Sequence, residues 1–128
     1  MRKLISLAFF IFIAGAFRGN AQSLHNTAWK AFFTGPNDTL TLHIGIDSSF
    51  VTMSNGDIAA RSTIRVSKDT LSLTDFDGQF MCPNSTGVYQ FTVSTDKLVM
   101  KLISDPCDGR STAINGVEWS RVKIKENH

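Results

Sequence analysis

The stretch DTLTLHI at Asp38–Ile44 decides the fold class, and DTLSL at Asp69–Leu73 repeats its pattern later in the chain. In both stretches leucine or isoleucine alternates with threonine, serine or histidine, and a period of two is typical of a strand that buries one face. Turn-forming residues precede each stretch, because Asp and Asn side chains hydrogen-bond the nearby backbone. The repeated pattern therefore predicts a turn followed by a strand.

Eight segments of the chain have this strand pattern, and most are separated by short connections. The sequence SNGD at Ser54–Asp57 predicts a two-residue type I′ hairpin turn, and a short helical turn is expected around Asp108–Asn115. Consecutive short strands predict an all-β fold, an eight-stranded antiparallel up-and-down barrel, with a two-sheet sandwich as the alternative. The expected strands are Thr27–Thr34, Thr39–Gly45, Ser49–Ser54, Asp57–Val66, Thr70–Thr74, Val88–Ser94, Lys97–Ser104 and Val117–Lys125.

The amino-terminal segment has the pattern of a secretory signal peptide. Two basic residues precede the apolar run Leu4–Phe17, and small residues follow it up to Ala21. The run is shorter than the roughly 20 apolar residues of a membrane span. We therefore expect a cleaved signal peptide at 1–21, with cleavage after Ala21 or alternatively Ala16, and one domain at 22–128. This predicts a periplasmic or secreted protein with no stable membrane span after cleavage.

The basic character of the whole chain belongs to this signal. The full sequence has 13 basic and 11 acidic residues. Removing Arg2, Lys3 and Arg18 from the 13 leaves 10 basic residues against 11 acidic ones, a formal net charge of −1. The exported domain lacks the clustered basic residues that nucleic-acid binding requires, so no nucleic-acid partner is expected.

Both cysteines, Cys82 and Cys107, lie in the expected exported domain. Two cysteines in an oxidising compartment most simply form one disulfide, whereas free thiols or a metal site are the alternatives. In an up-and-down barrel the odd-numbered connections lie at the same end. The two long connections, Asp75–Gly87 and Asp105–Gly116, are the fifth and the seventh, so this topology brings the cysteines to one loop-rich rim.

Alternation also predicts which side chains face the lumen, among them Trp29, Ala60 and Leu102. An eight-stranded barrel is either filled by its side chains or holds one small ligand, and both possibilities stay open. No Ser/His/Asp trio and no dense set of metal ligands emerges from the spacing. We therefore expect neither an enzyme nor a metal or cofactor site. The candidate ligand-binding residues are Phe33, Ser62, Tyr89, Phe91 and Met100.

A family resemblance rests on NTAWKA at Asn26–Ala31, on the sequence from Cys82 to Arg110, and on VEWSR at Val117–Arg121. These segments resemble the lipocalin superfamily, and in particular small secreted lipocalin-like proteins of bacteria. The resemblance implies that Trp29 fills the closed end of the barrel and that Arg121 packs across it. It also implies a small apolar or amphipathic ligand in the lumen and at the loop-rich rim.

The alternative function is a protein-binding module, such as a small barrel protease inhibitor. A protein partner would be contacted through a protruding segment. The candidates are Gln22–Asn26 and the Phe76–Thr86 loop, where Phe76, Phe80 and Met81 are expected to be exposed.

Overall fold

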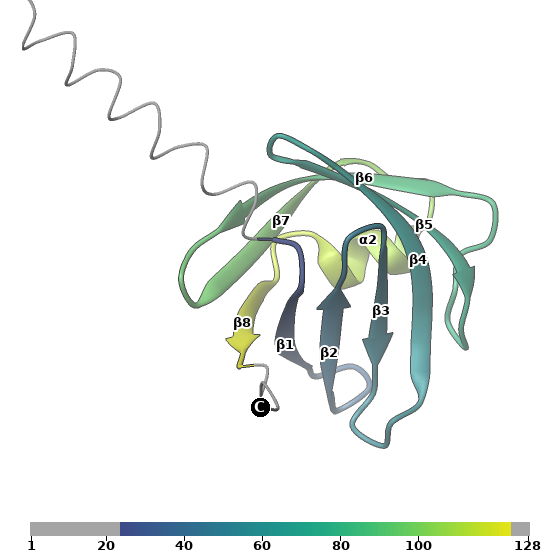
Figure 1. Ribbon diagram of the computed structural model, residues 1–128. Coiled ribbons are helices and arrows are strands. Elements are labelled where there is room, and N and C mark those ends of the chain that lie inside the picture. Colours follow the sequence, from purple (N-terminus) through teal and green to yellow (C-terminus); the bar gives the residue numbers. More distant parts are fainter. Residues whose placement is uncertain (1–23, 124–128) are drawn as a thin grey trace, which may run out of the picture.

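The computed structural model describes residues 24–123, and the predicted signal peptide lies outside these residues. Eight strands form a closed barrel in which each strand pairs with its neighbours in sequence and β8 pairs with β1, every pair being antiparallel (Figure 1). This confirms the up-and-down barrel and excludes the sandwich. In chain order the elements are β1 (Thr27–Phe33), β2 (Asp38–Ile44), β3 (Ser48–Thr52), β4 (Ile58–Ser67), β5 (Thr70–Asp77), β6 (Thr86–Val93), β7 (Lys97–Ser104), α2 (Asp108–Ile114) and β8 (Glu118–Val122).

Three irregularities interrupt the otherwise regular pairing. Between β3 and β4, Val51 pairs with Ala60 and Thr52 with Ile58, so Ala59 is an extra residue. Similar shifts leave Phe76 unpaired in β5 and Ile103 unpaired in β7. A bulge of this kind bends its strand and redirects the neighbouring side chains. Phe76 and Ile103 are consequently exposed although they lie in strands.

The predicted type I′ turn at Ser54–Asp57 is wrong. A type I′ turn needs a positive φ at both central residues, but here Gly56 has a φ of 93° while Asn55 is not among the residues with positive φ. The amide of Gly56 donates to the carbonyl of Met53, and the amide of Met53 donates to the carbonyl of Asp57, both at 2.9 Å. The connection between β3 and β4 is therefore longer than two residues.

The end of the barrel with the tight turns is closed by Trp29. Its ring is fully buried, and its Nε1 donates to Oγ1 of Thr27 at 2.7 Å. The guanidinium of Arg121 lies over this ring, 4.4 Å from its centre. Arg121 also donates from Nε to the carbonyl of Thr95 at 2.6 Å. These contacts join β1, the β6–β7 turn and β8 at the closed end.

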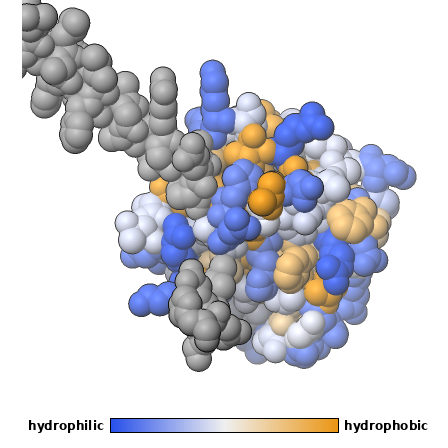
Figure 2. Space-filling view, viewed as in Figure 1, coloured by the Kyte–Doolittle hydropathy of each residue, from blue (hydrophilic) through white to orange (hydrophobic). Residues whose placement is uncertain are grey.

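The packed core extends from Trp29 to Tyr89, whose hydroxyl reaches the loop-rich end. Its largest fully buried side chains are Trp29, Tyr89, Leu24, Leu98 and Met100. Burying a large apolar side chain of this kind stabilises a fold by about 1.5–3 kcal/mol. On the outer face, hydrophobic residues are scattered among hydrophilic ones in the view of Figure 2. In the described part of the chain, no helix has the length and hydrophobicity to cross a membrane.

Candidate functional site

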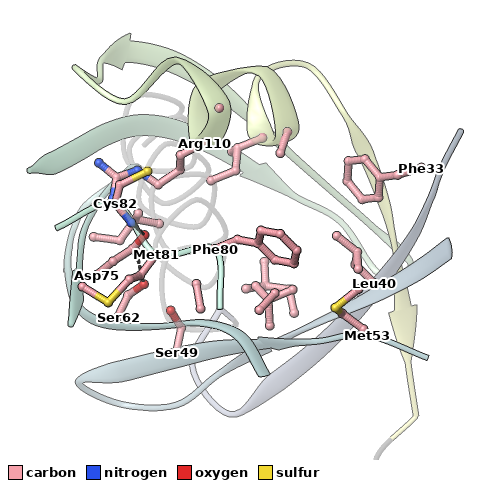
Figure 3. Close-up of a pocket in the computed structure, with 18 of the residues that line it drawn as sticks. Phe33, Leu40, Ser49, Met53, Ser62, Asp75, Phe80, Met81, Cys82 and Arg110 are labelled. Atoms are coloured by element: carbon pink, nitrogen blue, oxygen red, sulfur yellow. Dashed lines mark hydrogen bonds and ion pairs between the residues drawn. The ribbon is translucent and has the colours of Figure 1, made fainter. Parts of the chain in front are cut away.

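A cavity of about 520 Å³ lies beside this core and opens at the loop-rich end (Figure 3). Its volume falls within the roughly 300–1,000 Å³ of typical small-molecule sites. The lining residues come from β1 to β5, from the connections at the loop-rich end, from α2 and from β8. Figure 3 shows Phe33, Leu40 and Met53 on one side of the cavity, with Ser62, Asp75 and Arg110 on the opposite side.

Small side chains in the wall leave room for the cavity. Ala59 and Ala60 both line the cavity, because the bulge in β4 places two consecutive residues at the wall. Ser49 and Ser62 are also small, and they line the cavity as well.

The segment after β5 folds across the opening. Gly78 has a φ of +119°, and a Cβ there would lie 2.6 Å from both the carbonyl oxygen of Ala59 and Cα of Ala60. Only glycine allows this close approach of two backbones. Two residues later the amide of Phe80 donates to the carbonyl of Ala59 at 2.8 Å. The Phe80 ring therefore lies at the mouth, where it lines the cavity and remains 62% exposed (Figure 3).

The five candidate ligand-binding residues separate into two groups. Phe33 and Ser62 lie in the cavity wall. Tyr89, Phe91 and Met100 are not among the lining residues but are buried in the packed core. Alternation shows correctly that they face inward, but it does not show that side chains from other strands cover them.

Helix α2 forms one wall of the cavity and is held there by the disulfide. Cys82 in the β5–β6 connection is bonded to Cys107, the residue that precedes the helix, with 6.3 Å between the two Cα atoms. This confirms the predicted disulfide and its location at the loop-rich rim. The helix presents Arg110, Ala113 and Ile114 to the cavity.

Arg110 forms the centre of a buried ionic cluster that fixes the helix to the barrel. Its Nε and Nη2 each donate to one carboxylate oxygen of Asp105 at 2.8 Å. Its Nη1 lies 3.4 Å from Asp75, a residue of β5. Side-chain exposure is 6% for Arg110, 3% for Asp75 and 0% for Asp105. Such a buried arrangement persists only when its polar groups are paired.

The carboxylates of Asp75 and Asp105 accept their remaining hydrogen bonds from barrel side chains and from the amides of the two cysteines. Asp75 accepts from Ser62 Oγ at 2.6 Å and from the amide of Cys82 at 2.9 Å. Asp105 accepts from the hydroxyl of Tyr89 at 2.5 Å and from the amide of Cys107 at 2.9 Å. The amide at each end of the disulfide therefore donates to one of the two carboxylates that Arg110 joins.

The cluster has a defined charge state. Burial raises the pKa of Tyr89, and its hydrogen bond to the Asp105 carboxylate adds to this, so Tyr89 is neutral at physiological pH. Burial alone would raise the pKa of Asp105, but the hydrogen bonds from Arg110 and Tyr89 outweigh it and hold that pKa below its usual value. The hydrogen bond to Asp105 raises the pKa of Arg110. The Asp105 carboxylate is therefore ionised opposite a charged guanidinium.

Asp105 and Arg110 are neighbours in one connection, so their pairing is local in the sequence, whereas their partners Asp75 and Tyr89 were not predicted. Those two residues lie on other strands, and only the barrel closure brings them together. Because Arg110 is enclosed by Asp75 and Asp105, the cavity presents mainly apolar surface to a ligand. Within residues 24–123 no group of three or more His, Cys, Asp or Glu side chains is arranged to hold a metal ion.

Comparison of the chain with protein-family models, with curated proteins and with solved structures finds no match.

Proposed function

We propose that this protein is an exported lipocalin-like barrel that binds a small apolar or amphipathic molecule in its cavity, without catalysing a reaction. The observation that carries the proposal is the apolar cavity of about 520 Å³ beside a fully packed core. A ligand there would contact Phe33, Leu40 and Met53 on one side and α2 on the other. Export is supported by the Cys82–Cys107 disulfide, because such bonds persist in oxidising compartments.

Native mass spectrometry on the protein purified from its host's exported fraction tests whether a ligand is carried. A mass above that of the oxidised polypeptide, lost on denaturation, supports the proposal and gives the size of the ligand. A bare polypeptide mass from freshly isolated protein, together with no uptake of neutral apolar dyes, contradicts it.

A pair of helix variants locates the binding. Ala113 faces the cavity, whereas its neighbour Thr112 is exposed and does not line it. We expect Ala113→Trp to fill the cavity and reduce binding of the neutral dye Nile red at least tenfold. Thr112→Trp adds the same side chain one position away and is expected to leave binding unchanged. Equal affinities of the two variants would place the dye outside the cavity.

A protein-binding module remains a second candidate, because the segment Phe76–Thr86 exposes Phe76 and Phe80. Met81, which was also expected to be exposed, is instead half-buried and lines the cavity. Phe76 is 55% exposed and does not line the cavity. A screen of proteases for inhibition by the exported chain tests this function. Inhibition that is lost in Phe76→Ser but retained in Ala113→Trp would favour a protein partner over a small ligand.

A further inference from the structure

The charged side chains of the barrel are distributed unequally between its two ends. Six carboxylates and two basic groups lie at the loop-rich end, when the strand residues Lys30, Lys101 and Glu118 are counted at neither end. The carboxylates are Asp38, Asp57, Asp75, Asp77, Asp105 and Asp108, and the basic groups are Arg61 and Arg110. The end that contains the cavity mouth therefore has a formal charge of −4.

The opposite end has the reverse balance. Its tight turns and the strand residues that border them carry five basic groups, Arg65, Lys68, Lys97, Arg121 and Lys123. They carry only three carboxylates, Asp47, Asp69 and Asp96. The net charge of −1 for the exported chain conceals this separation, which appears only when the strand order is known.

The acidic residues of the loop-rich end lie beside the cavity opening. Asp57 is two residues from Ala59, and Asp108 is next to Gly109, both of which line the cavity. Asp38 accepts a hydrogen bond from the amide of Ser54, so it lies where two of the connections meet. Both Asp57 and Asp108 are exposed to solvent.

The basic groups at this end are already engaged. Arg110 gives two hydrogen bonds to Asp105 and faces Asp75 with its third nitrogen, and its side chain is almost completely buried. Arg61 pairs with Asp77 at 3.5 Å on the outer surface. Nη1 of Arg110 makes no hydrogen bond but lies 3.4 Å from Asp75, so an anionic head group in this cavity would compete with Asp75 for it. The head group would also meet the exposed carboxylates of Asp57 and Asp108.

Resting on the proposed function, we propose that the ligand is a cationic amphiphile, with its apolar body in the cavity and a protonated amine or similar group at the acidic mouth. The cavity is the binding site, and the surrounding charge selects among ligands with equal apolar bodies. Low-dielectric walls lined with one sign of charge concentrate oppositely charged ligands.

Three probes with the same alkyl chain, dodecylammonium, dodecanol and dodecanoate, test the inference in the exported full chain. Their affinities are measured by displacement of Nile red at low ionic strength, below the aggregation threshold of each probe. We expect the order dodecylammonium, then dodecanol, then dodecanoate, with about tenfold between the first and the last. The difference should shrink at higher salt, because the Debye length is about 10 Å at 0.1 M.

Charge-neutralising variants test whether the preference for dodecylammonium over dodecanoate comes from the carboxylates at the cavity mouth. The double variant Asp57→Asn, Asp108→Asn is expected to reduce the ratio of dodecylammonium to dodecanoate affinity about threefold. Asp96→Asn removes one carboxylate at the closed end and should leave the ratio unchanged. A dodecanoate affinity equal to or greater than that of dodecylammonium would overturn the charge selectivity while leaving a cavity that binds. If none of the three probes binds, the proposed function fails as well.

Discussion

Arg110→Met removes the only cation of the buried cluster and leaves two carboxylates behind. Asp75 keeps its bonds from Ser62 and Cys82, and Asp105 keeps those from Tyr89 and Cys107, but neither retains a counter-charge. Breaking a buried pair by removing one partner typically costs about 3–5 kcal/mol. Since a small domain has only about 5–15 kcal/mol of unfolding free energy, the loss would be a large part of the total.

The destabilisation caused by Arg110→Met has a characteristic pH dependence. In the native protein the pKa of Asp105 lies below its usual value. This carboxylate therefore contributes stability above the unfolded pKa of about 3.9, and the contribution is lost as pH falls through the lowered native pKa. Without Arg110, burial raises the pKa of the carboxylate instead. Protonation of Asp105 then removes the unfavourable buried charge from the variant. The difference in unfolding free energy between the variant and the native protein should therefore be smaller near pH 4 than at pH 7.

Urea unfolding followed by tryptophan fluorescence, with the disulfide intact, measures the loss of unfolding free energy. Repeating it at pH 7 and pH 4 measures how that loss depends on pH. Arg61→Met is the matched control, because Arg61 forms an exposed pair with Asp77. Exposed pairs contribute at most about 1 kcal/mol. A loss for Arg110→Met no greater than that of the control, or a deficit that does not change between pH 7 and pH 4, would refute the argument.

Three further outcomes follow from the structure. Gly87→Ala places a Cβ 2.5 Å from Asp105 Oδ2, so urea titration should show a loss of about 1–3 kcal/mol of unfolding free energy. Gly35→Ala is the control and should cost far less, because no atom lies within 4 Å of the added Cβ. Replacing both cysteines by serine should lower the thermal midpoint, because the disulfide spans 25 positions and a loop of that size is worth about 3.5 kcal/mol in the chain-entropy treatment. Burial lowers the pKa of His43, which stacks on Phe50 at 4.3 Å, so protonation favours the unfolded chain. Unfolding free energy should fall as pH drops below about 6.5, and His43→Gln should remove that part of the pH dependence; an identical profile in the variant would contradict the assignment.

The alternation in the sequence was sufficient to predict the barrel, because each strand buries one face and the turns between strands are short. The order of the connections was likewise sufficient to place Cys82 and Cys107 at one rim. These are properties of a single strand or of the chain order, so they can be read from local sequence.

The division of the lumen into core and cavity could not be predicted in the same way. It depends on which side chains meet across the barrel, as the burial of Tyr89, Phe91 and Met100 shows. The bulges were also invisible in the sequence, because an extra residue such as Ala59 breaks the alternation without a distinctive signal. Leu102, expected in the lumen, is 41% exposed beside the bulge at Ile103.

The coexistence of a packed core and a cavity in one lumen has a consequence for how this protein can change during evolution or in the laboratory. Side chains such as Trp29 and Leu98 are fully buried in the core and do not line the cavity. Ala60, Ser49 and Ala113 line the cavity and do not belong to the core cluster. Enlarging a residue that borders empty space displaces little neighbouring structure. New ligand preferences can therefore be acquired at these positions while the central core residues stay unchanged.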